Sequence, residues 1–117
     1  MRYLLLIHGD EAIWTNATEA DRAAMYAAYG KLSREMEEHG HLRGSDELSS
    51  AATSKIVRVR DGETLVADGP FAETKEQLGG YFVVECDLAT ALGYAARIPD
   101  AELGAVEVRA VVEDSAS

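Results

Sequence analysis

The sequence has 117 residues, a hydrophobic content of 47% and a formal net charge of -10 at pH 7. This length allows one domain with a core of its own. The acidic balance argues against binding to nucleic acid or to an anionic membrane surface, since both require a basic face. No apolar run approaches the roughly 20 residues that span a bilayer.

Two further features indicate a cytoplasmic protein. The apolar run at residues 3–7 is too short for the hydrophobic region of a signal peptide. Cys86 is the single cysteine, so the chain has neither a disulfide framework nor a cysteine-based metal site.

The first half of the chain predicts a strand and then a long helix. Residues 2–7 form a continuous apolar run, which is typical of a strand covered on both faces. Thr18 and Asp21 have the spacing of a capping box, and Gly40 is a typical helix stop. Between them we expect one amphipathic helix whose apolar positions are Met25, Tyr29, Leu32 and Met36.

The second half predicts a hairpin and a second strand–helix–strand unit. Residues 41–48 are ambiguous, and residues 45–54 are polar enough to be a loop with a short strand before it. Residues 55–60 and 64–67 have strand patterns interrupted by Asp61-Gly62, which is a hairpin signal. Then follow a strand at 81–86, a helix capped by Asp87 and stopped by Pro99, a strand at 106–112 and a disordered tail at 113–117.

This order of elements predicts a single α+β domain, residues 1–112, of the ferredoxin-like split βαβ type with an extra β-hairpin. Both helices then cover one face of the sheet. No further helix is available for the other face, so we expect a second copy of the chain to cover it in a homodimer packed sheet to sheet.

A charged loop, residues 68–81, lies between two of the predicted strands. Gly69-Pro70 predicts a turn, and Gly79-Gly80 a second flexible point before the next strand. Scaffolds often place their chemistry on such loops. An ordinary surface loop is the other interpretation.

His8 and Asp68 are the candidate catalytic residues, because both come at the ends of predicted strands. A histidine that titrates near neutral pH can act as a general base, oriented by a carboxylate. A strand-end histidine bonded to backbone is the structural alternative. The spacing of the His, Asp and Glu residues matches no known metal motif, and no phosphate or dinucleotide loop is present, so neither a metal nor a cofactor is predicted.

Several segments resemble the YCII-related family, in its DGPF branch. The loop reads Asp68-Gly69-Pro70-Phe71-Ala72-Glu73-Thr74-Lys75-Glu76, followed by Gly79-Gly80-Tyr81. Residues 1–11 resemble the family's first strand, 57–62 its hairpin, and 95–99 and 106–109 its last helix and strand. In one departure, Ala110 follows Arg109 where the family usually has a proline.

The resemblance implies a dimeric α+β barrel built from ferredoxin-like subunits. It also implies two directions for function. Some YCII-related proteins have been suggested to be enzymes that use a His–Asp pair in a cleft, whereas members of the DGPF branch are often encoded beside extracytoplasmic-function sigma factors.

Two functional hypotheses and one structural alternative follow. In the first, a small-molecule enzyme or ligand-binding protein has a cavity between sheet and helices, with His8 and Asp68 as catalytic pair; its ligand-binding residues are Asp10, Trp14, Phe71, Glu73, Lys75 and Tyr81. In the second, the acidic dimer is a regulatory protein that binds a basic partner such as a sigma factor. In the third, the charged loop is purely a scaffold.

Overall fold

The computed structural model describes residues 1–113. Of the tail predicted to be disordered, residues 114–117 lie outside the described part. The helices are α1 (Glu11–Thr15), α2 (Glu19–Glu38), α3 (Leu88–Arg97) and α4 (Asp100–Leu103), with a short 3-10 turn at Ala51–Thr53. The strands are β1 (Arg2–Asp10), β2 (Leu42–Glu47), β3 (Lys55–Arg60), β4 (Glu63–Asp68), β5 (Glu76–Glu85) and β6 (Ala105–Ala110).

Four strands form one sheet in the order β2-β5-β1-β6, in which every neighbouring pair is antiparallel. The two central strands are β1 and β5, with Tyr3 opposite Val84. Long connections containing α2 and α3 lead from each central strand to an edge strand, which is the split βαβ arrangement. The predicted ferredoxin-like α+β fold is therefore confirmed, while the barrel, which needs a second copy, stays a prediction.

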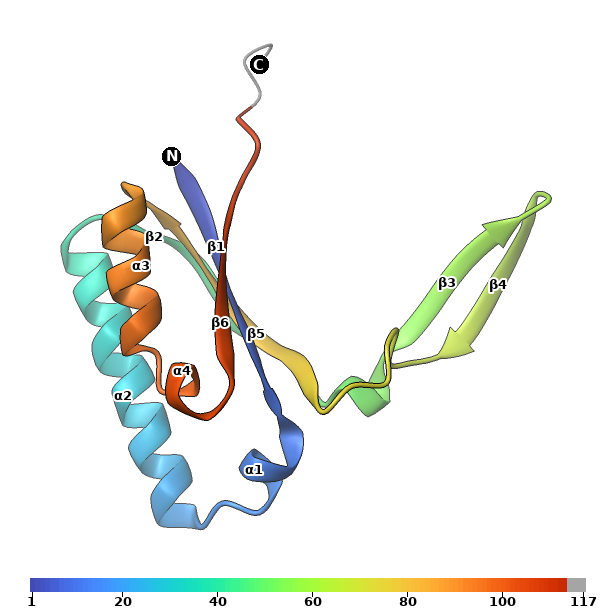
Figure 1. Ribbon diagram of the computed structural model, residues 1–117, viewed down its shortest axis with the longest axis horizontal. Coiled ribbons are helices and arrows are strands. Elements are labelled where there is room, and N and C mark those ends of the chain that lie inside the picture. The colour runs from blue at the N-terminus through green and yellow to red at the C-terminus, as the bar shows by residue number, and fades with distance from the viewer. Residues whose placement is uncertain (114–117) are drawn as a thin grey trace.

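The core lies on one face of this sheet, between the strands and the two long helices. Alternate residues of β1, Tyr3, Leu5 and Ile7, are buried there, because side chains in a strand point to opposite faces in turn. The same buried cluster contains residues of β5, α2 and α3: Phe82, Val84, Leu32, Met36, Ala91, Tyr94, Ala95 and Ile98. Both long helices thus cover the same face, as predicted, and lie side by side in Figure 1.

The helix and turn signals of the sequence are confirmed. The Thr18 hydroxyl accepts a hydrogen bond from the Asp21 backbone N–H at 3.1 Å and caps α2. The Asp87 carboxylate caps α3 in the same way. Asp61 and Gly62 have φ angles of 51° and 76°, which suits the tight turn that joins two strands of a hairpin.

Gly79 and Gly80 lie inside β5, so the prediction that they belong to the flexible loop is wrong. The pairing of β1 with β5 shifts register between Ile7 and His8, opposite these glycines. A Cβ on Gly80 would come within 3.0 Å of the Asp46 carbonyl oxygen. Glycine is therefore required here by close backbone approach and not by a turn.

The predicted strand ends also differ. β1 continues to Asp10, three residues past the apolar run, and its last residue caps α1. The last strand ends at Ala110 and not at residue 112. In the ambiguous segment, the strand β2 extends to Glu47.

The hairpin of β3 and β4, residues 55–68, extends away from the rest of the molecule in Figure 1; we call it the arm. Its strands pair with each other and with no strand of the main sheet. Val57 and Val66 are opposite one another and are 61% and 64% exposed. An isolated two-stranded hairpin is marginally stable in water. The exposed apolar side chains of the arm therefore favour packing of the arm against another surface.

Leu5→Ala is expected to lower the free energy of unfolding by about 2–5 kcal/mol, because Leu5 is fully buried in the core cluster. Urea denaturation followed by circular dichroism measures this. Val112→Ala, at a position that is 90% exposed, is the control and should change stability by less than about 0.5 kcal/mol. Equal effects of the two variants would contradict this placement of the core.

Candidate functional site

A cavity of about 590 Å³ lies on the helix-covered side of the sheet. The strands contribute Ile7 from β1 and Phe82 from β5, whereas α2 contributes Met25, Tyr26 and Tyr29. The remaining walls come from α1, α4, the end of β2 and the loop that follows it. A volume of this size is typical of sites for small organic molecules.

Aromatic side chains form much of the wall. Trp14 meets Tyr26 edge to face, with ring centroids 5.2 Å apart. Deeper in, Tyr29 stacks on the buried Phe82 at 6.1 Å. The Arg22 guanidinium lies 5.9 Å from the centroid of the Trp14 ring, and it donates to the backbone carbonyls of Trp14 and Thr15. These aromatic rings therefore give the cavity flat, apolar surfaces against which a ligand can pack.

Each tyrosine hydroxyl of the cavity donates to a carboxylate on another element. Tyr26 of α2 donates to Glu47 of β2 at 3.1 Å, and this hydrogen bond raises the pKa of the phenol. Tyr29 donates to Asp100 of α4, and burial, reinforced by that hydrogen bond, raises its pKa strongly. Both phenols are therefore held protonated, as donors, well above neutral pH.

Two acidic residues at the start of α1 are used for local structure. The Asp10 carboxylate accepts from the Ala12 N–H at 2.9 Å and so caps α1. The Glu11 carboxylate accepts from the Ala51 N–H at 2.6 Å and from the Ser50 hydroxyl at 2.9 Å. Glu11 thereby ties the wall of the cavity to the segment that leads into the arm.

Of the predicted ligand-binding residues, Asp10, Trp14 and Tyr81 line the cavity. Tyr81 lies opposite Leu6 and Asp46, so the side chains of Tyr81 and Asp46 are on the face of the sheet that the helices leave open. There the Tyr81 hydroxyl donates to the Asp46 carboxylate at 2.7 Å, which raises the pKa of the phenol. The other predicted site residues are not in the lining: His8, Asp68, Phe71, Glu73 and Lys75.

His8 lies on the opposite face of the sheet. Its Nε2 is 3.2 Å from the Glu107 carboxylate, and Glu107 lies opposite Leu6, on the face that the helices leave open. Arg109 also donates to Glu107. The hydrogen bond from Arg109, and to a smaller extent the one from His8, holds the pKa of Glu107 below its usual value.

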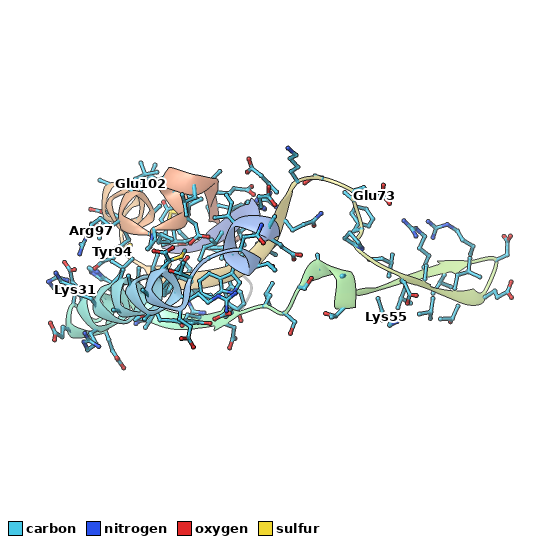
Figure 2. The ribbon with its side chains drawn as sticks, turned by 90° about the horizontal axis from the view of Figure 1, so that it is seen from below. Lys31, Lys55, Glu73, Tyr94, Arg97 and Glu102 are labelled. Carbon is cyan, nitrogen blue, oxygen red and sulfur yellow. The ribbon has the colours of Figure 1, made fainter. Side chains whose placement is uncertain are left out.

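Asp68 is carried by the arm. Its carboxylate pairs with Lys55 and is 81% exposed, and within residues 1–113 no hydrogen bond joins Asp68 to His8. Lys55 lies on the arm and Glu73 in the loop next to it, at the opposite end of the molecule in Figure 2 from Tyr94 and Arg97. One chain therefore does not bring the two candidate catalytic residues together.

The rest of the charged loop has structural contacts. Phe71 is 78% exposed and lies under the Arg58 guanidinium, 5.8 Å from its ring centroid. The Gln77 side-chain amide donates to the carbonyls of Ala72 and Thr74 and so closes the loop on itself. Among the described residues, Glu73 and Lys75 form neither a salt bridge nor a side-chain hydrogen bond.

Sequence reasoning missed most of the cavity lining. Met25 and Tyr29 were expected as core positions of a helix, and this same periodicity was the signal that placed them on an inward face. Asp46 and Glu47 fell in the ambiguous segment. Asp100 was missed because its short helix, α4, follows the proline that was taken only as a stop.

Residues 1–113 contain neither a candidate metal cluster nor a membrane-spanning helix. No group of three or more His, Cys, Asp or Glu side chains there is arranged to hold a metal ion. No helix in this part of the chain is long and apolar enough to cross a membrane.

Two comparisons with known proteins show the family to which the chain belongs. The model of the YCII-related domain matches residues 1–114. An uncharacterised protein, R00369, of Rhizobium meliloti (strain 1021) is 33% identical over 112 residues, which cover 93% of this chain and 90% of the relative. The match extends over nearly the whole chain, and the protein belongs to the YCII-related family.

Proposed function

We propose that this protein is a homodimeric small-molecule binding protein whose ligand occupies the cavity between the sheet and its helices. The observation that carries the proposal is the cavity itself: about 590 Å³, with aromatic walls and a few oriented hydroxyl and carboxylate groups. Such a combination of apolar surface and few polar groups is typical of ligand sites.

The homodimer part of the proposal is supported by the face of the sheet that the helices leave open. Leu4, Leu6 and Val83 are half-buried on that face, where Leu4 lies opposite Val83. A strand that is apolar on both faces favours cover on both. A second copy that presents the same face would bury these side chains and leave both cavities, on the helix sides, free to bind ligand.

Leu6→Lys is expected to convert a dimer into a monomer, because it places a charge in the middle of the proposed interface. Analytical ultracentrifugation at micromolar concentration measures the mass. Leu92→Lys, on the exposed side of α3, is the matched control and should leave the dimer intact. A wild-type protein that sediments with the mass of one chain would contradict the dimer.

Ser33→Phe is expected to weaken binding of a small-molecule ligand by at least about tenfold, because Ser33 lines the cavity from α2 and a phenyl ring would fill part of it. Fluorescence of Trp14, the single tryptophan and a cavity residue, detects ligands from a library. Arg34→Phe, one position along and exposed, is the control. Equal binding by the two variants would place the ligand elsewhere.

A catalytic role for His8 and Asp68 remains part of the proposal. Because Asp68 pairs with Lys55 at the base of the arm and, within residues 1–113, forms no hydrogen bond with His8 of its own chain, the pair would form between two copies. Because His8 lies on the open face of the sheet, such a pair would act on a substrate held between the two copies and not on the ligand in the cavity. His8→Ala should then abolish turnover of that substrate with a change of less than about 1 kcal/mol in the free energy of unfolding. Loss of stability with turnover intact would show that His8, held by Glu107, is structural.

The alternative function is a regulatory protein of the DGPF branch, located in the cytoplasm, that binds a sigma factor. It is supported by the net charge of -10, which would complement a basic partner. It predicts salt-sensitive capture of a purified sigma factor that Ser33→Phe leaves unchanged, together with no small-molecule ligand. Ligand binding without such capture would favour the first proposal.

A further inference from the structure

The charged side chains of the residues that line the cavity are all negative. Among its lining residues, within the described part of the chain, there is no Lys, Arg or His, but there are four acidic residues apart from Asp46, whose side chain lies on the open face: Asp10, Glu11, Glu47 and Asp100. The hydrogen bonds found for these four come from uncharged donors: hydroxyls of Tyr26, Tyr29 and Ser50, and backbone N–H groups of Ala12 and Ala51.

No ion pair within residues 1–113 neutralises these carboxylates. The ion pairs among residues 1–113 involve other acidic residues, such as Glu35, Glu85 and Glu107, and none includes a carboxylate of the cavity. Arg22, which lies over Trp14, donates to backbone carbonyls and is not in the lining. A concave, partly apolar site lined by charges of one sign concentrates ligands of the opposite sign.

The aromatic wall adds to this preference. The rings of Trp14, Tyr26 and Tyr29 all line the cavity, and the negative faces of aromatic rings attract organic cations. The hydrogen bond to Glu47 raises the pKa of Tyr26, and burial together with the hydrogen bond to Asp100 raises the pKa of Tyr29, so both phenols act as polar but uncharged groups. Apolar surface, aromatic faces and uncompensated carboxylates together match a molecule with an apolar body and a cationic head.

We infer that the cavity takes a small organic cation, such as a primary amine on an aromatic or branched aliphatic body. This rests on the proposed function, since it assigns a ligand class to the same cavity. Asp100 and Glu47 are the groups that select the cation. They lie on opposite walls, α4 and β2, and each accepts from a tyrosine of α2.

The test compares three probes with the same aromatic body and different charge: phenethylamine, 2-phenylethanol and 3-phenylpropionate. Titration calorimetry and Trp14 fluorescence near neutral pH measure their binding to the full chain. The amine is expected to bind at least about tenfold more tightly than the alcohol, and the carboxylate most weakly. Added salt should reduce the preference, because it screens exposed charges.

Glu47→Gln and Asp100→Asn test the residues assigned. Each keeps an oxygen that can accept from its tyrosine but removes the charge, so the double variant should fold normally and reduce the preference for the amine to about threefold or less. Glu102→Gln, an exposed carboxylate two positions from Asp100 on α4, is the control and should keep the wild-type preference.

The failures are distinguishable. Equal binding of amine and alcohol, or an unchanged preference in the double variant, would overturn the cation assignment and leave the cavity as a ligand site. Absence of binding for all three probes, with no effect of Ser33→Phe on any ligand of a wider library, would overturn the proposed function and the inference with it.

Discussion

The rest of the structure depends on β1, the central strand with apolar side chains on both faces. On one face, Tyr3, Leu5 and Ile7 are buried under the helices and form the core. On the other face, Leu4 and Leu6 are half-buried without a helix over them. Burying apolar surface is the dominant favourable term in folding and in association. The sequence of one strand therefore favours both an internal core and an external partner.

This division of faces separates two sets of functional groups. Residues that alternate with the core on the open face, such as His8 beside Glu107, belong to the side where the proposed dimer forms. The cavity lies on the helix side, where β1 ends and Asp10 begins α1. A ligand site on the helix side can be changed in sequence without disturbing the proposed interface.

Glu11 connects the wall of the cavity to the base of the arm. Its carboxylate holds Ser50 and Ala51 at the base of the arm, while its neighbours Ile13 and Trp14 form cavity wall. Also at the base of the arm, the Gly69 N–H donates to the Ser54 carbonyl at 2.7 Å. The direction of the arm is thus set by contacts at its base, next to the cavity.

The fold was predictable from the sequence because its signals are local. Thr18, Asp87 and Asp61-Gly62 specify a helix start or a turn through their own backbone and side-chain chemistry. The site was less predictable because its groups come from separate elements. Asp100 and Tyr29 are bonded although 71 positions separate them in the sequence, and no pattern within either segment predicts that contact.

The charged loop, residues 68–81, shows that a conspicuous sequence motif need not mark the site. Its turn at Gly69-Pro70 and its role between two strands were expected, yet its conspicuous charges are not what lines the cavity. Gln77, which bonds the loop to itself, was not singled out. A motif rich in turn and charged residues can therefore mark a loop with a defined backbone conformation. The residues that line the cavity are instead spread along the chain.

A crystal structure of the protein as it assembles in solution tests the division of the sheet into two faces most directly. The expected result is two sheets packed through Leu4, Leu6 and Val83, with both cavities open to solvent on the outer, helical sides. An assembly in which the open sheet face is left in solvent, or in which α2 forms the interface and closes the cavities, would contradict it.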